Sequence, residues 1–238
     1  ALKVYRSIRG DEFLNRANLR IEGVERKDTV VNIREEDPGV AKIISASPDE
    51  RRYPQAGALV LLAKEDIEIT AENTINSKMH YLVKILNERG KEGFAESSIE
   101  YDSTFEKIEL VFARTIKPDG SVAYVGSRHI RDVSKYLNFP LYSNARVFII
   151  SFPEVAVGSV LEYKVKVKRS QLVNRKDFFL SYPLQGYEPI ISAEFNLIFP
   201  QDKEIRLKFI NQEYNNFSAS LIPQKTRKKE KKVYSWKF

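Results

Sequence analysis

The chain of 238 residues contains no cysteine and only two histidines, His80 and His129. Without thiols it can form no disulfide and no cysteine-ligated zinc site, and it has no cysteine nucleophile. His80 falls among lysines on the polar side of an alternating segment, which predicts a surface histidine, and His129 lies in the charged stretch 128–132. The two histidines are too far apart in the sequence to suggest a metal site, and no histidine adjoins Ser97-Ser98 or Asp102-Ser103 to suggest a serine triad.

Glycine-rich phosphate-binding motifs are also missing, since the sequence contains neither a P-loop nor a Rossmann fingerprint. Acidic pairs such as Glu65-Asp66 are interpreted as solvated charges in loops rather than as paired catalytic carboxylates. The sequence therefore predicts no catalytic residue, no cofactor and no metal.

Long apolar runs are absent as well. No stretch of about 18 apolar residues occurs, so no membrane-spanning helix is predicted. The first ten residues carry Lys3, Arg6 and Arg9 and lack the apolar stretch of a secretion signal. Because the chain begins with Ala1, we expect a processed protein or a segment of a longer one.

The net charge of +7 is concentrated in one segment. Residues 225–232 contain six basic residues and one glutamate, a local charge of +5 that leaves only +2 for the other 230 residues. A short charge run of this kind is typical of a solvated hairpin or loop. We therefore expect no specific binding of nucleic acid.

Apolar and polar residues alternate from Tyr53 onward, which is the pattern of half-buried strands. In residues 159–169 the alternation places Leu161, Tyr163, Val165 and Val167 inward, with Glu162, Lys164, Lys166 and Lys168 outward. Pro118-Asp119-Gly120 predicts a tight turn between two paired strands. Many short strands separated by turns indicate an all-β sandwich of antiparallel strands. The expected strands are 58–62, 74–86, 108–116, 122–125, 147–152 (buried on both faces), 159–169, 191–199, 205–209, 217–221 and 233–238.

The first fifty residues differ from the rest and are predicted to form an N-terminal segment, with the β-sandwich domain occupying residues 51–238. Residues 30–33 have the composition of a strand. Asp37 followed by Pro38 predicts a helix start, with Asp37 as N-cap and Val40, Ile43 and Ile44 on one side of a short helix over 39–47.

Aromatic residues are frequent in the connections between the later strands, where the core demands them less. Stacked rings of this kind build platforms for sugars, but they also cover the ends of a sandwich, and both interpretations stay open. The residues considered for a ligand surface are Tyr136, Phe139, Tyr142, Tyr182 and Tyr187.

Five segments occur in the order of a known family: YPQAGALVLL (53–62), VKILNERGKEGFAESSIEYD (83–102), ARTIKPDGSV (113–122), SFPEVAVGSVLEYK (151–164) and YSWKF (234–238). Together they resemble the bacterial domain of unknown function that precedes transglutaminase-like domains. The resemblance covers roughly residues 40–238. It implies an immunoglobulin-like β-sandwich, followed by a papain-like domain that would carry a Cys-His-Asp triad.

The resulting hypothesis is a non-catalytic accessory domain of a bacterial transglutaminase-like protein, which positions the enzyme domain or recognises its substrate. The expected partners are the downstream transglutaminase-like domain and a polypeptide or glycan ligand. The resemblance also implies a location outside the cytoplasm, in the periplasm or on the cell surface. The alternative is a carbohydrate- or peptidoglycan-binding module, which the aromatic connections suggest.

Overall fold

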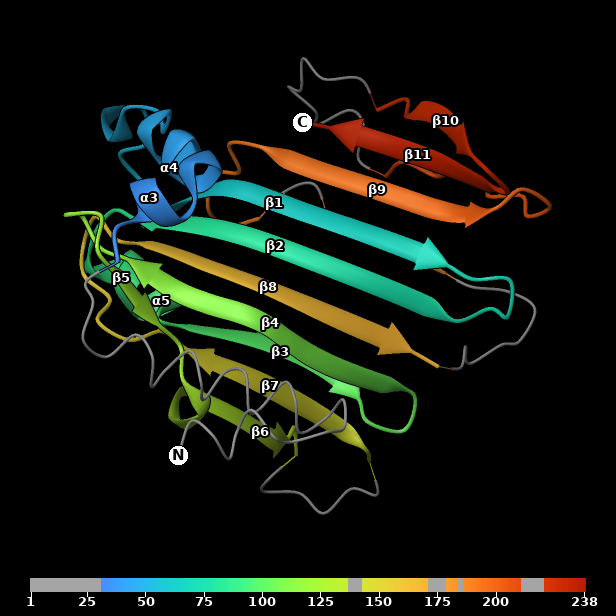
Figure 1. Ribbon diagram of the computed structural model, residues 1–238, viewed down its shortest axis with the longest axis horizontal. Helices are drawn as coiled ribbons and strands as arrows, with labels where there is room; N and C mark the ends of the chain where they lie inside the picture. The colour runs from blue at the N-terminus through green and yellow to red at the C-terminus, as the bar shows by residue number, and fades with distance from the viewer. Residues whose placement is uncertain (1–30, 137–142, 171–178, 184–185, 211–220) are drawn as a thin grey trace.

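The computed structural model describes residues 31–136, 143–170, 179–183, 186–210 and 221–238, which form two β-sheets and a few short helices (Figure 1). The large sheet has eight strands in the order β10-β11-β9-β1-β2-β8-β4-β5, and the small sheet has three in the order β3-β7-β6. The strands of the large sheet are β1 (Ala58–Ile69), β2 (Ile75–Ile85), β4 (Glu106–Ile116), β5 (Val122–Tyr124), β8 (Val160–Arg169), β9 (Ala193–Pro200), β10 (Gln224–Lys228) and β11 (Lys231–Lys237).

The small sheet consists of β3 (Glu96–Asp102), β6 (Ile130–Ser134) and β7 (Ala145–Ser151). All pairings are antiparallel except that of β1 with β9, which is parallel. The predicted all-β sandwich with a short helical segment before it is therefore confirmed. The helices are α3 (Ile33–Glu36), α4 (Pro38–Ser45) and α5 (Glu88–Phe94), with 3-10 turns η1 (Glu50–Arg52) and η2 (Ser127–His129).

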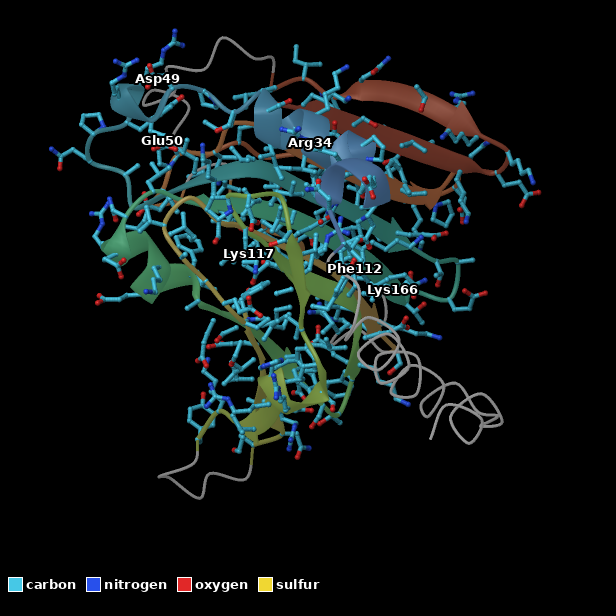
Figure 2. The ribbon with its side chains drawn as sticks, turned by 60° about the vertical axis from the view of Figure 1, so that its left-hand side comes forward. Arg34, Asp49, Glu50, Phe112, Lys117 and Lys166 are labelled. Carbon is cyan, nitrogen blue, oxygen red and sulfur yellow. The ribbon has the colours of Figure 1, made fainter. Side chains whose placement is uncertain are left out.

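The two faces of the large sheet carry different cores. The inner face packs against the small sheet, where Ile150 of β7 meets Leu161 and Val165 of β8. The outer face is covered at one end by α3 and α4, which bury Leu59 of β1 and Leu82 of β2. Figure 2 shows Arg34 on these helices above the large sheet, with Phe112 and Lys166 farther along the strands.

A third core lies on the inner face at the β9 and β11 side of the large sheet. It consists of Phe195, Phe199 and Trp236 with aliphatic side chains of β1 and β2. Alternation in β9 explains this core, because every second residue from Ala193 to Phe199 is buried. The predicted strand over 191–199 is confirmed.

Local sequence signals account for several boundaries. Asp37 caps α4 and accepts a hydrogen bond from the Val40 amide at 3.0 Å, as predicted. The turn at Pro118-Asp119-Gly120 joins β4 to β5, and Gly120 has a φ of +85°, which favours glycine. The basic segment 225–232 forms the exposed hairpin of β10 and β11, as expected.

Two expected strands do not form as strands among the described residues, although Asn32 of the expected strand 30–33 makes an isolated antiparallel bridge with Ser121. Residues 33–36 form the helical turn α3, because the Asn32 side chain accepts from the Arg34 amide at 3.0 Å and caps it. Residues 205–209 are irregular, and Leu207 is 40% exposed, so their alternation does not reflect a buried strand face. The expected strand 217–221 lies outside the described residues, apart from Leu221.

Three predictions of burial were wrong. Glu162, expected to face solvent, is fully buried, because α3 and α4 cover that end of the outer face. His80 is half-buried rather than at the surface, since it lies beside Glu162. The strand around 147–152 is not buried on both faces: Ile150 is fully buried in β7, whereas Val147 and Ile149 keep partial exposure.

Candidate functional site

A groove runs along the inner face of the large sheet where the small sheet does not cover it. It consists of two hollows of about 250 Å³ and 520 Å³, which meet at Val60, Gly93 and Phe94. The smaller hollow has the stacked rings of Tyr81 and Tyr163 in its lining and the first residues of β3 at one side. The groove is therefore bounded by both sheets and by α5.

Helix α5 forms one wall because it packs unusually close to the start of β1. Asn87 caps the helix and accepts from the Gly90 amide at 3.1 Å. A Cβ atom on Gly90 would collide with the carbonyl oxygen of Gly57, so only glycine allows this approach. At Gly93 an added Cβ would meet nothing within 4 Å, because this residue faces the open groove.

The floor of the smaller hollow is aromatic. The rings of Tyr81 and Tyr163 stack with their centroids 5.3 Å apart, and Phe152 packs against Tyr163 at 6.2 Å. Burial raises the pKa of both tyrosine hydroxyls, and the side chain of Ser97 is hydrogen-bonded to Tyr163. These hydroxyls therefore stay protonated at physiological pH and offer neutral donors and acceptors along an apolar surface.

One carboxylate, that of Glu65, lies on the same face. Residues Ala63, Glu65 and Ile67 are successive inward positions of β1, paired with Tyr81, Met79 and Ser77 of β2. Burial, and then the charge of the adjacent Asp66, raise the pKa of Glu65 above its ordinary value. The prediction that Glu65 and Asp66 lie in a loop was wrong, because the strand continues beyond Leu62 and turns the two carboxylates to opposite faces.

The predicted ligand-surface residues are only partly brought together. Tyr187 lines the larger hollow and is fully exposed, while Tyr182 stacks on Phe195 with centroids 4.3 Å apart. Tyr136 follows β6 of the small sheet and lines neither hollow. Phe139 and Tyr142 lie outside the described residues.

A second polar cluster lies on the outer face beneath α3 and α4. Glu162 accepts from Arg114 Nε at 2.6 Å, and its other oxygen lies 2.7 Å from His80 Nε2. Arg114 also lies 3.3 Å from Glu36 and 3.4 Å from Asp37 of the covering segment. Burial disfavours the charged guanidinium of Arg114. The charge of Glu162 and the hydrogen bonds to Glu162 and Tyr124 together outweigh this effect, so the pKa of Arg114 is raised. This cluster ties the helices to the sheet, so we assign it a structural role.

No group of three or more metal-ligating side chains occurs in the part of the chain that the structure describes. His129 accepts a hydrogen bond from the Gly126 amide through Nδ1 at 3.1 Å, which gives it a turn-stabilising contact. Within the described ranges, no helix is long and apolar enough to cross a membrane.

Residues 71–238 match the sequence model of a family described as a domain of unknown function with solved structure, DUF3857. The chain belongs to this family. No curated protein matches it. The expected kinship with a domain of unknown function is thus confirmed, whereas the transglutaminase-like neighbour is not addressed by this match.

Among solved structures, a protein described as a candidate protease from Parabacteroides distasonis is similar at a TM-score of 0.61 and 11% identity. The match covers 76% of this chain and 35% of that protein, so the chain spans about a third of its length. At this identity the likeness shows a shared fold alone. An M1 zinc metallopeptidase from Deinococcus radiodurans matches at a TM-score of 0.36 and 12% identity, over 77% of this chain and 39% of that one. A TM-score this low supports no further inference.

Proposed function

We propose that this chain is a non-catalytic accessory domain of a bacterial transglutaminase-like protein, and that it recognises the polypeptide substrate of the enzyme. The observation that carries the proposal is the similarity in fold to about a third of a larger candidate protease. A fold that recurs as one part of such a protein suits a module that serves a separate catalytic domain. The groove supplies the surface that recognition requires.

The groove suits an extended polypeptide because it combines an apolar floor with the edge of a sheet. Strand β3 pairs only with β7 among the described strands, and its first residues, Glu96 to Ser98, line the smaller hollow. Edge strands offer unpaired backbone groups to an added segment, and pockets for alternate side chains then give specificity.

A blocking substitution tests this function. We expect residues 1–238 to bind unfolded polypeptides or extended peptides without cleaving them, and Gly93→Leu to weaken binding at least about tenfold, because a leucine there fills the groove where the backbone leaves space. Lys166→Leu is the matched control, because it introduces the same leucine side chain on the outer face of the sheet, and it should bind normally. Turnover of peptide, ester or amide that is lost on changing one serine or aspartate would refute the non-catalytic assignment. Equal affinity of both variants for the peptide would refute the assignment of the groove as the binding site.

A glycan ligand is the second candidate, favoured by the exposed ring of Tyr187 at the larger hollow. Aromatic rings presented in this way stack on sugar rings. A glycan array and a pull-down with peptidoglycan separate the two candidates. Retention on cell-wall polymer that Tyr187→Ala abolishes would favour the glycan, and absence of binding at millimolar ligand would remove it.

The location outside the cytoplasm and the transglutaminase-like partner are parts of the same proposal. Cell fractionation of the source bacterium, followed by detection with an antibody against this chain, tests the location. Detection of the protein in the cytoplasmic fraction alone would contradict it. A coding region for a Cys-His-Asp domain continuous with this chain would support the partner.

A further inference from the structure

Glu65 lies in surroundings that are unusual for a carboxylate. On one side its strand partner is Met79 of β2, and on the other it is Phe195 of β9. Side chains directly opposite one another on a sheet face are close neighbours. The carboxylate therefore stands between a thioether and an aromatic ring, on a face whose other members are mainly apolar, and it keeps partial exposure to solvent.

Tyrosine rings flank this position on both sides. Tyr182 stacks on Phe195, and Tyr81 lies on β2 at the next inward position along the strand from Met79. The charge of Glu65 contributes to the raised pKa values of Tyr81 and Tyr182, that of Tyr182 reaching about 12 after the larger effect of burial. The carboxylate is thus near enough to both tyrosines to influence them, and Tyr81 also lines the groove.

No basic side chain of the described ranges forms an ion pair with Glu65. The neighbouring Lys64 points to the other face and binds Glu194 at 2.9 Å. The ammonium group of Lys232, near the third core, has other partners. Its Nζ lies 5.9 Å from the centroid of the Phe199 ring and donates a hydrogen bond to the carbonyl of Lys203. Among the described residues, the negative charge at Glu65 therefore has no counter-charge on a largely apolar face, an arrangement that costs stability and that a cationic ligand would relieve.

We propose that Glu65, flanked by Tyr81 and Tyr182, binds the ammonium group of a lysine side chain in the polypeptide that occupies the groove. This inference rests on the proposed function. A carboxylate supplies a charge-assisted hydrogen bond to the ammonium, and aromatic rings attract a cation through their faces while they cover the aliphatic part of the lysine. The charge and the rings together fit an alkylammonium better than an anion or a neutral polar group.

The test compares two blocked peptides that differ only in a central lysine or norleucine, which share the aliphatic stem and differ in the charge. Calorimetry with residues 1–238 should give at least about tenfold tighter binding of the lysine peptide, the effect of one charge-assisted hydrogen bond. Glu65→Gln should remove this preference. Asp66→Asn is the matched control, because it removes the same charge one residue away on the opposite face, where Asp66 accepts from Asn196 at 2.7 Å.

The outcomes are distinguishable. If neither peptide nor any unfolded polypeptide binds, the proposed function fails and this inference fails with it. If peptides bind but show no lysine preference, or if Glu65→Gln keeps the preference, the inference alone is overturned. Misfolding cannot explain a loss in Glu65→Gln if this variant melts at or above the temperature of the parent chain, as removal of a desolvated charge predicts.

Discussion

Replacing Glu162 by alanine should destabilise the fold far more than replacing an exposed glutamate on the same sheet. The side chains of Glu162 and Arg114 are 0% and 4% exposed, and the two are joined at 2.6 Å. Removing Glu162 leaves a buried guanidinium with its longer contacts to Glu36, Asp37 and the Tyr124 hydroxyl. It also removes the 2.7 Å contact with His80.

The magnitude follows from burial. Breaking a buried ion pair by removing one partner costs about 3–5 kcal/mol, because the remaining charge stays desolvated. We expect Glu162→Ala to lower the free energy of unfolding by about 3 kcal/mol, since Glu36 and Asp37 of the covering segment still compensate the charge of Arg114 in part. Glu109→Ala is the matched control: its pair with Lys166 is 3.0 Å long, but the side chains are 39% and 46% exposed. Screening by solvent limits that pair to about 0–1 kcal/mol.

Urea denaturation followed by circular dichroism measures both values under a two-state analysis. A third variant, Arg114→Met combined with Glu162→Leu, removes both charges and should recover most of the lost free energy of unfolding. Equal costs for Glu162→Ala and Glu109→Ala would refute the reasoning. A double variant as unstable as Glu162→Ala would show that the uncompensated guanidinium is not the cause of the loss.

Three further predictions concern the inner face and the helix beside the groove. Gly90→Ala should destabilise the fold by about 1–3 kcal/mol through overpacking, whereas Gly93→Ala in the same helix should stabilise it by up to about 1 kcal/mol. Thermal melts of both variants measure the difference. The reverse order would contradict the close approach of α5 to the Gly57 backbone. Val165→Ala, at a site 1% exposed, should cost about 1–3 kcal/mol, and Lys166→Ala about 0.5 kcal/mol or less; equal effects in urea would mean a different register. Glu65 has a raised pKa when folded, so its charge costs stability at neutral pH. Glu65→Gln should therefore exceed the parent in stability at pH 7, and this advantage should vanish as the pH falls from the raised pKa to the ordinary value of 4.5. A constant difference across that range would exclude titration of Glu65 as its cause.

Patterns of local origin were predictable from the sequence. The period-2 alternation in 191–199 specified a strand with one buried face because side chains of a strand alternate between faces whatever the partner strand is. The Asp37-Pro38 helix start and the Pro118-Asp119-Gly120 turn were also predictable, since capping and turn conformations depend on the residues themselves.

The candidate site was less accessible to this reasoning. Extending the predicted strand 58–62 by plain alternation would have turned Glu65 outward, because a bulge between Val60 and Leu62 shifts the register and brings Glu65 to the inner face. Its surroundings could not be found in this way. Phe195 is 130 residues away in the chain and becomes a neighbour only because β9 pairs in parallel with β1. Likewise, the groove exists because β3 belongs to the small sheet while Tyr81 and Tyr163 belong to the large one.

The sequence by itself determined the all-β class, the positions of most strands and turns, and the exposed basic hairpin over 225–232, because these depend on local alternation, turn chemistry and charge. Only the tertiary structure decided which part of the large sheet is covered on both of its faces. Glu162 has the pattern of an outward residue, and it is buried because α3 and α4 pack over that end of the sheet. Burial of a polar residue is set by what covers it, and the covering segment lies more than a hundred residues away in the chain.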